Sequence, residues 1–112
     1  MAEITDEYMK NMMLKTKEYT VVILKATEKI KNPGTEKIIW EHGRRNFWLR
    51  EEGILSIVCP IRDGSNVTGV GVFNRTPDEV KEIMDGDPGV IEGIFNYEIH
   101  LSRSFPDDKL PY

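Results

Sequence analysis

The chain has 112 residues, which is enough for one compact domain with a small core. Its 39% hydrophobic and 30% charged residues are typical of a folded globular protein and exclude a disordered, collagen-like or coiled-coil chain. Fifteen Lys and Arg residues against nineteen Asp and Glu residues give a net charge of −4, so no basic field is available to hold nucleic acid or an anionic membrane. We therefore expect neither nucleic acid nor a membrane among the partners.

The start of the chain predicts a short helix followed by a strand. Thr5 is a suitable N-cap, because Asp6 and Glu7 after it complement the positive end of a helix dipole. These acids also argue against a secretory signal peptide, which needs a basic start and an unbroken apolar run at this position. Residues 18–26 are apolar and β-branched on both alternations, as in a central strand covered on two faces.

A long helix is predicted next. Residues 32–34 read Asn-Pro-Gly, which indicates a turn, and Thr35 is expected to cap a helix over residues 36–52. Gly53 follows at the position where glycine commonly ends a helix. No apolar stretch along the chain reaches the roughly eighteen residues that a membrane-spanning helix requires.

The middle of the chain predicts a β-hairpin. Residues 54–60 and 67–73 are two apolar runs joined by the turn-forming residues 62–66, so the two strands are expected to pair antiparallel. Residues 69–71 read Gly-Val-Gly within the second strand. Bare glycines there predict a shallow depression in one sheet face that accepts helix side chains or a ligand.

The last third predicts a second helix and a final strand. Thr76 is placed as an N-cap, Pro77 occupies the first helical position, and the helix is expected to stop near Gly86. Residues 94–101 alternate apolar and polar side chains strictly, which is typical of a strand with one covered face.

The resulting order β-α-β-β-α-β is that of the ferredoxin-like α+β fold, with a four-stranded antiparallel sheet and two helices on one face. We divide the chain into an N-terminal helical extension (1–17), the ferredoxin-like domain (18–103) and a C-terminal tail (104–112). The second face of the sheet would leave a large apolar patch, and such patches usually mark interfaces. A homodimer through the sheet face is the expected partner arrangement.

Two histidines are candidates for acid–base chemistry. His42 lies on the long helix in a stripe with Ile38, Asn46 and Leu49, and it either exchanges protons with a substrate or only bonds a neighbour. The same two interpretations apply to His100 on the polar face of the last strand, where a solvated side chain is the simpler one.

Asp63 and Asp87 are both candidates to accept the Nδ1 proton of His42 and fix its tautomer. Each also stands in a sequence that forms a local turn, Arg-Asp-Gly or Asp-Pro-Gly, so a purely structural role is the alternative. The spacing alone does not choose between the two aspartates.

Three arginines are candidates to bind an anionic or phenolic substrate through bidentate hydrogen bonds: Arg44, Arg45 and Arg103. The alternative is that they are only solvated, as surface arginines usually are.

The single cysteine, Cys59, is expected to be a small buried hydrophobe. A chain with one cysteine cannot form an intramolecular disulfide, which fits a reducing, cytoplasmic location. Two distant histidines give no recognised metal-ligand spacing. The aromatic side chains of the long helix are expected in the core or an interface: Trp40, Phe47 and Trp48.

Two segments resemble the YciI-related (YCII) domain family. One runs from His42 through Leu49 and Gly53 to Cys59-Pro60, with Asp63 shortly after, and the other is the Asp-Pro-Gly-Val-Ile-Glu-Gly segment at residues 87–93. The resemblance covers roughly residues 19–103. Two departures are Cys59, where the family commonly has glycine, and Asn46, a polar residue beside the histidine where the family has an apolar one.

The resemblance implies a ferredoxin-like domain that dimerises through its sheets into an α+β barrel, with a pocket near the histidine and an acidic partner. Some relatives are associated with dehydrochlorination of chlorinated hydroquinones. We therefore expect a lyase or isomerase that uses His42 with Asp63 or Asp87 and needs no cofactor, with Arg44, Arg45, Asn46, Arg103 and His100 as substrate-binding candidates. The alternative is a dimeric module that binds a small ligand without changing it.

Overall fold

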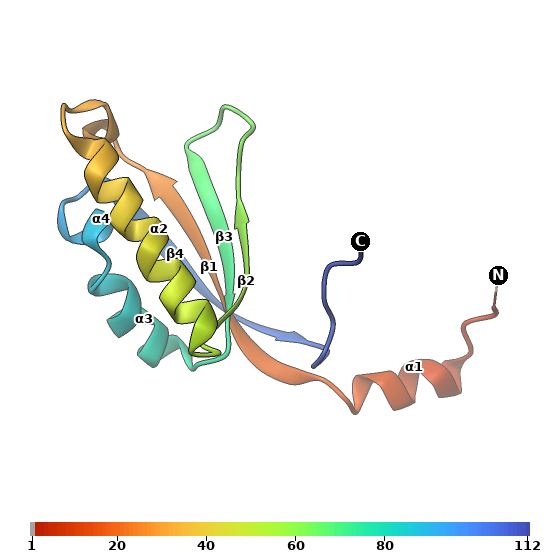
Figure 1. The fold of residues 1–112 in the computed structure, drawn as a ribbon. Helices are drawn as coiled ribbons and strands as arrows, with labels where there is room; N and C mark the ends of the chain where they lie inside the picture. The colour runs from red at the N-terminus through yellow and green to blue at the C-terminus, as the bar shows by residue number, and fades with distance from the viewer. Residues whose placement is uncertain (1) are drawn as a thin grey trace.

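The computed structural model describes residues 2–112 and shows a single four-stranded sheet with helices on one face (Figure 1). The strands lie in the order β2-β3-β1-β4, and every neighbouring pair is antiparallel. This order confirms the predicted ferredoxin-like α+β fold. The elements in chain order are α1 (Asp6–Met13), β1 (Lys17–Ala26), the 3-10 helix η1 (Glu28–Lys31), α2 (Thr35–Glu51), β2 (Leu55–Pro60), β3 (Val67–Phe73), α3 (Pro77–Asp85), α4 (Pro88–Ile91) and β4 (Phe95–Ser104).

Strand β1 is central because both of its faces carry apolar side chains. Thr20, Val22 and Leu24 are buried on the side of the helices, while Val21 and Ile23 are half-buried on the opposite side. The helix-side residues belong to the main hydrophobic core, whose buried members are Val22, Leu24, Leu49, Leu55, Phe73, Val80, Met84, Ile94 and Phe95.

The caps of two helices are as predicted, and the cap of the longest helix is not. The Thr5 hydroxyl accepts the Tyr8 backbone N–H, and Thr76 forms a complete capping box with Glu79. Helix α2 is instead capped by Gly34, which adopts φ 84° and contributes no side chain. Thr35 is the first residue of the helix.

Two short elements were not predicted. The 3-10 helix η1 connects β1 to α2, and the Thr35 hydroxyl joins them by donating to the Ile30 carbonyl at 3.0 Å. The four-residue helix α4 follows Asp87, which caps it. Strand β4 is also longer than expected, because Ser104 still pairs with Lys17 at the start of β1.

Cys59 and the three aromatic residues of α2 are not in the core. Cys59 is exposed, since β2 is an edge strand and the cysteine points away from the helix layer, between Val58 and Pro60. The prediction of a buried cysteine is therefore wrong. Trp40, Phe47 and Trp48 lie on the outer side of α2 and are more than half exposed, so they are not core residues.

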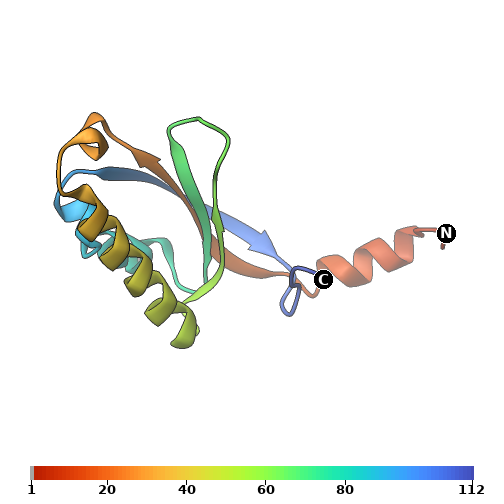
Figure 2. The same cartoon turned by 45° about the horizontal axis from the view of Figure 1, so that its top comes forward.

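Helix α1 extends away from the sheet beyond the start of β1 (Figure 2), and none of its side chains is buried. The face of the sheet opposite α2, α3 and α4 carries no helix (Figures 1 and 2). Within residues 2–112, no helix has the length and apolar character needed to cross a membrane.

Candidate functional site

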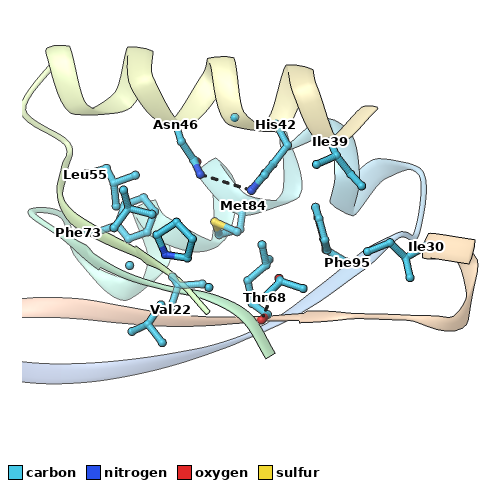
Figure 3. A pocket seen from close by; sticks show the side chains of 17 residues that line it. Val22, Ile30, Ile39, His42, Asn46, Leu55, Thr68, Phe73, Met84 and Phe95 are labelled. Carbon is cyan, nitrogen blue, oxygen red and sulfur yellow. Dashed lines mark hydrogen bonds between the residues drawn. The ribbon is translucent and has the colours of Figure 1, made fainter. Parts of the chain in front are cut away.

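Helix α2 crosses the sheet over a cavity of about 320 Å³ (Figure 3). His42 and Asn46 are four residues apart, so the helical repeat places both on the face of α2 that looks toward the sheet. Strand β3 forms part of the floor. The residues that line the cavity are Val22, Leu24, Ile30, Ile39, His42, Gly43, Asn46, Leu55, Val58, Pro60, Thr68, Gly69, Val70, Gly71, Phe73, Met84 and Phe95.

The imidazole of His42 is bonded to a buried carboxylate behind it. The Nδ1 atom lies 2.7 Å from Oδ1 of Asp87, and the two side chains are 14% and 2% exposed. Of the two aspartates that the sequence left open, the structure brings Asp87 to the histidine. A short contact at such low exposure fixes the ring orientation, because the carboxylate has little water to bond instead.

Asp87 is itself held by the start of α4. Its Oδ2 atom accepts the backbone N–H groups of Gly89 at 2.9 Å and Val90 at 3.3 Å. The side chain of Arg45, one turn along α2 from Glu41, approaches Oδ1 to 3.9 Å. Asp87 therefore fills both roles at once: Oδ2 caps the turn into α4, and Oδ1 bonds His42.

These contacts determine where the proton of the neutral imidazole lies. An ionised carboxylate only accepts hydrogen bonds, so Nδ1 of His42 carries the proton and donates it to Asp87. The Nε2 atom then holds a lone pair, and it lies 3.4 Å from the side-chain nitrogen of Asn46. The lone pair faces the cavity, as a general base requires.

Phe95 and Gly89 set the position of the imidazole from below. The rings of His42 and Phe95 pack with centroids 4.9 Å apart at 55°. A Cβ atom on Gly89 would lie 2.3 Å from Cδ2 of Phe95 and 3.1 Å from Oδ2 of Asp87, so only glycine fits there. The site therefore depends on a residue that carries no chemistry of its own.

The glycines of β3 form the predicted depression, since Gly69 and Gly71 both line the cavity. A Cβ on Gly71 would meet Leu55 Cδ1 and Phe73 Cε1 at 3.1 Å each. The side chains of Leu55 and Phe73 therefore fill the space over Gly71, whereas a Cβ on Gly69 would meet only the Cys59 carbonyl oxygen, at 3.6 Å.

The cavity is apolar apart from three side chains, those of His42, Asn46 and Thr68. The Thr68 hydroxyl donates to the Leu24 carbonyl at 3.2 Å, so its proton is used within the sheet. Among residues 2–112, no Lys, Arg, Asp or Glu side chain lines this cavity. A carboxylate or phosphate ligand would therefore lose its hydration there without gaining a cation.

The other predicted site residues lie elsewhere. The Asp63 carboxylate is exposed in the β2–β3 turn, where hydrogen bonds from Ser65 hold its pKa below the ordinary value. Arg44 bonds Glu41 on the outer side of α2, and Arg103 is exposed near the C-terminal tail.

His100 lies on the face of the sheet without helices. It pairs in register with Val21, whose side chain is on that face, and its ring contacts Glu98 at 3.3 Å. The hydrogen bond from Lys25 lowers the pKa of Glu98 most, and the hydrogen bond from His100 lowers it further. In the described part of the chain, no three His, Cys, Asp or Glu side chains converge as a metal site would need.

Two residues of the site escaped the sequence analysis. Phe95 could have been found from the alternation of the last strand, which puts it on the covered face. Gly89 could not have been found in this way, because its role depends on how closely α4 approaches β4 in space.

Comparisons with known proteins identify a fold and no more. No protein-family model matches the chain, and no curated protein matches it by sequence. Among solved structures, the chain is similar to 5-chloro-2-hydroxyhydroquinone dehydrochlorinase from Burkholderia phenoliruptrix AC1100 in complex with 2,5-dihydroxybenzoquinone. The TM-score is 0.50 at 14% sequence identity, over 73% of this chain and 90% of the other. This likeness agrees with the ferredoxin-like fold.

Proposed function

We propose that the chain is a YciI-related, cofactor-independent lyase or isomerase acting on a small uncharged ring, with His42 as the general base and Asp87 as the residue that orients it. One observation carries the proposal. His42 lines an apolar cavity of about 320 Å³, its Nδ1 atom is bonded to a buried carboxylate at 2.7 Å, and within residues 2–112 its Nε2 atom has a polar contact only with Asn46, at 3.4 Å.

The reaction class follows from what such a site supplies. In an elimination, His42 Nε2 takes a proton from the substrate, and the electrons of the broken bond form a new double bond. A leaving group such as chloride departs from the neighbouring carbon with its own electron pair. Asp87 stabilises the imidazolium that forms, and the proton then passes to water. An isomerase would return the proton to a different carbon.

The chemical character of the cavity supports a ring substrate. Phe95 offers a flat apolar surface, Gly69 leaves room above β3, and the lining lacks charged partners for an anion. The neighbour of similar fold carries a dihydroxybenzoquinone, which is a compact ring of this kind. The arginines proposed from the sequence have no part in this site, except for Arg45, which supports Asp87 from outside the cavity.

We further propose that the uncovered sheet face pairs with a second copy. Val21, Ile23, Val70 and Val72 lie half-buried along β1 and β3. In register, Val21 neighbours Val72 and Ile23 neighbours Val70, so the four side chains form one apolar group. An apolar group of this kind on a sheet is usually covered by another surface.

The test is a pair of histidine variants. His42→Gln should abolish turnover on a panel of chlorinated hydroquinones and lactones, because glutamine cannot take up the proton. His100→Gln is the matched control for replacing a histidine, since His100 lies on the other sheet face. It should retain wild-type activity as long as sedimentation velocity shows that the oligomeric state is unchanged. Turnover that persists undiminished in His42→Gln refutes the assignment. Binding of rings by the wild-type chain without turnover of any panel member favours the non-catalytic binding module.

A further inference from the structure

The cavity contains a hydrogen-bond donor beside the catalytic lone pair, and this pair carries an inference that rests on the proposed function. Asn46 lies one helical turn after His42 and lines the same cavity (Figure 3). Its side-chain nitrogen is 3.4 Å from Nε2. Since Nε2 is the acceptor of the neutral ring, the amide N–H of Asn46 points at the lone pair.

This contact is long for a hydrogen bond, whose usual N–H donor–acceptor distance is about 2.9–3.0 Å. A weak contact between two half-buried groups is easily replaced by stronger bonds to a ligand. No other side chain of the cavity offers a free donor, because the Thr68 hydroxyl donates to Leu24. Asn46 and His42 are therefore the polar pair through which the cavity recognises its ligand.

We propose that Asn46 is a specificity-determining residue that, with His42, selects ligands carrying two oxygens on adjacent carbons. One oxygen bears a proton and donates it to Nε2 of His42. The other, a carbonyl or second hydroxyl oxygen, accepts the N–H of Asn46. The donor and acceptor atoms of the protein are close neighbours, so oxygens placed farther apart on a ring cannot reach both.

The pair also fixes which oxygen loses its proton. The hydroxyl on Nε2 is the one deprotonated, and the second oxygen lies next to the oxyanion that forms. Asn46 donates to this second oxygen, so its N–H dipole lies close to the developing negative charge and stabilises it electrostatically. No cation is needed in the cavity for this stabilisation.

The proposal is tested by ligand binding, measured independently of turnover. Catechol has adjacent hydroxyls, resorcinol is its isomer with separated hydroxyls, and phenol has one. Dissociation constants from NMR titration should favour catechol over resorcinol by about fivefold in the wild-type chain, the worth of one hydrogen bond. In Asn46→Leu, catechol and resorcinol should bind within twofold of each other, while phenol binds at least as well as before.

Asn46→Ala is the second variant, because it removes the donor without adding a charge and keeps a good helix former in α2. It should also lose the preference for catechol, and it keeps the test decisive if the leucine variant does not fold. A wild-type chain that does not prefer catechol, or that binds none of the three rings, overturns the proposal. So does a preference that survives in Asn46→Ala. None of these outcomes depends on whether His42 catalyses a reaction.

Discussion

Replacing Asp87 with asparagine tests the central contact of the site with the least change in shape. The side-chain oxygen of asparagine can still cap α4 by accepting the N–H groups of Gly89 and Val90, as Oδ2 of Asp87 does. Its NH2 group then faces Nδ1 of His42. Because that group only donates, Nδ1 must become the acceptor, and the imidazole proton moves to Nε2. The ring keeps its place and presents the wrong atom to the substrate.

The expected magnitudes separate this chemical effect from a loss of stability. The free energy of unfolding should fall by only about 1–2 kcal/mol in Asp87→Asn, since one charge-assisted hydrogen bond is weakened and the cap survives. Asp87→Ala loses the cap as well and leaves the half-buried Nδ1 without an acceptor, for about 2–4 kcal/mol in total. Turnover should nevertheless fall by roughly 100-fold to 10,000-fold in both. Asp87→Asn puts the proton on Nε2, and Asp87→Ala loses the carboxylate that orients the ring and stabilises the imidazolium.

Three measurements decide the outcome. Nitrogen-15 NMR of the two ring nitrogens reports the tautomer, denaturant unfolding reports stability, and steady-state kinetics on the ring panel reports turnover. Asp63→Asn is the matched control, since Asp63 lies in the exposed β2–β3 turn and should leave all three unchanged apart from a small local effect. A proton that stays on Nδ1 in Asp87→Asn, or turnover of substrate at the wild-type rate, would refute the orienting role of Asp87.

Three further predictions concern packing, pH and assembly. Gly89→Ala should lower the free energy of unfolding by about 1–3 kcal/mol and shift the ring signals of Phe95, because the added Cβ would lie 2.3 Å from Phe95 Cδ2; unchanged melting and Phe95 signals would contradict the packing seen here. The hydrogen bond from the Thr76 backbone N–H lowers the pKa of Glu79 below its ordinary 4.5, so its contribution to stability is complete above that pH and is lost as the pH falls through the folded-state pKa. Glu79→Gln keeps the cap without the titration, and unfolding curves measured below pH 4.5 should show a shallower loss of stability than wild type; an equal slope refutes the link. Ile23→Glu places a charge in the apolar group of the uncovered sheet face and should convert a dimer to monomers in sedimentation velocity, whereas a wild-type chain that is monomeric at high micromolar concentration argues against the dimer.

Local sequence patterns were enough to predict most of the fold. The strand alternation, the turn signals and the N-cap at Thr76 each depend on residues close together in the chain, so they can be predicted without knowing the tertiary structure. The ferredoxin-like order followed from the succession of these elements. The cap of α2 was misassigned to Thr35 because Gly34 acts there through its backbone alone, which no side-chain preference reveals.

The sequence by itself determined that His42 faces the same way as Asn46, since both lie on one helical stripe, and that an aspartate was available to orient the imidazole. Only the tertiary structure decided which one. Asp63 and Asp87 both lie far from His42 in the chain, and their local motifs are equally typical of turns. The packing of α4 against α2 brings Asp87 to 2.7 Å from the ring and buries it, while Asp63 stays in an exposed turn. Burial is what makes that contact strong, and burial arises from how distant segments pack together.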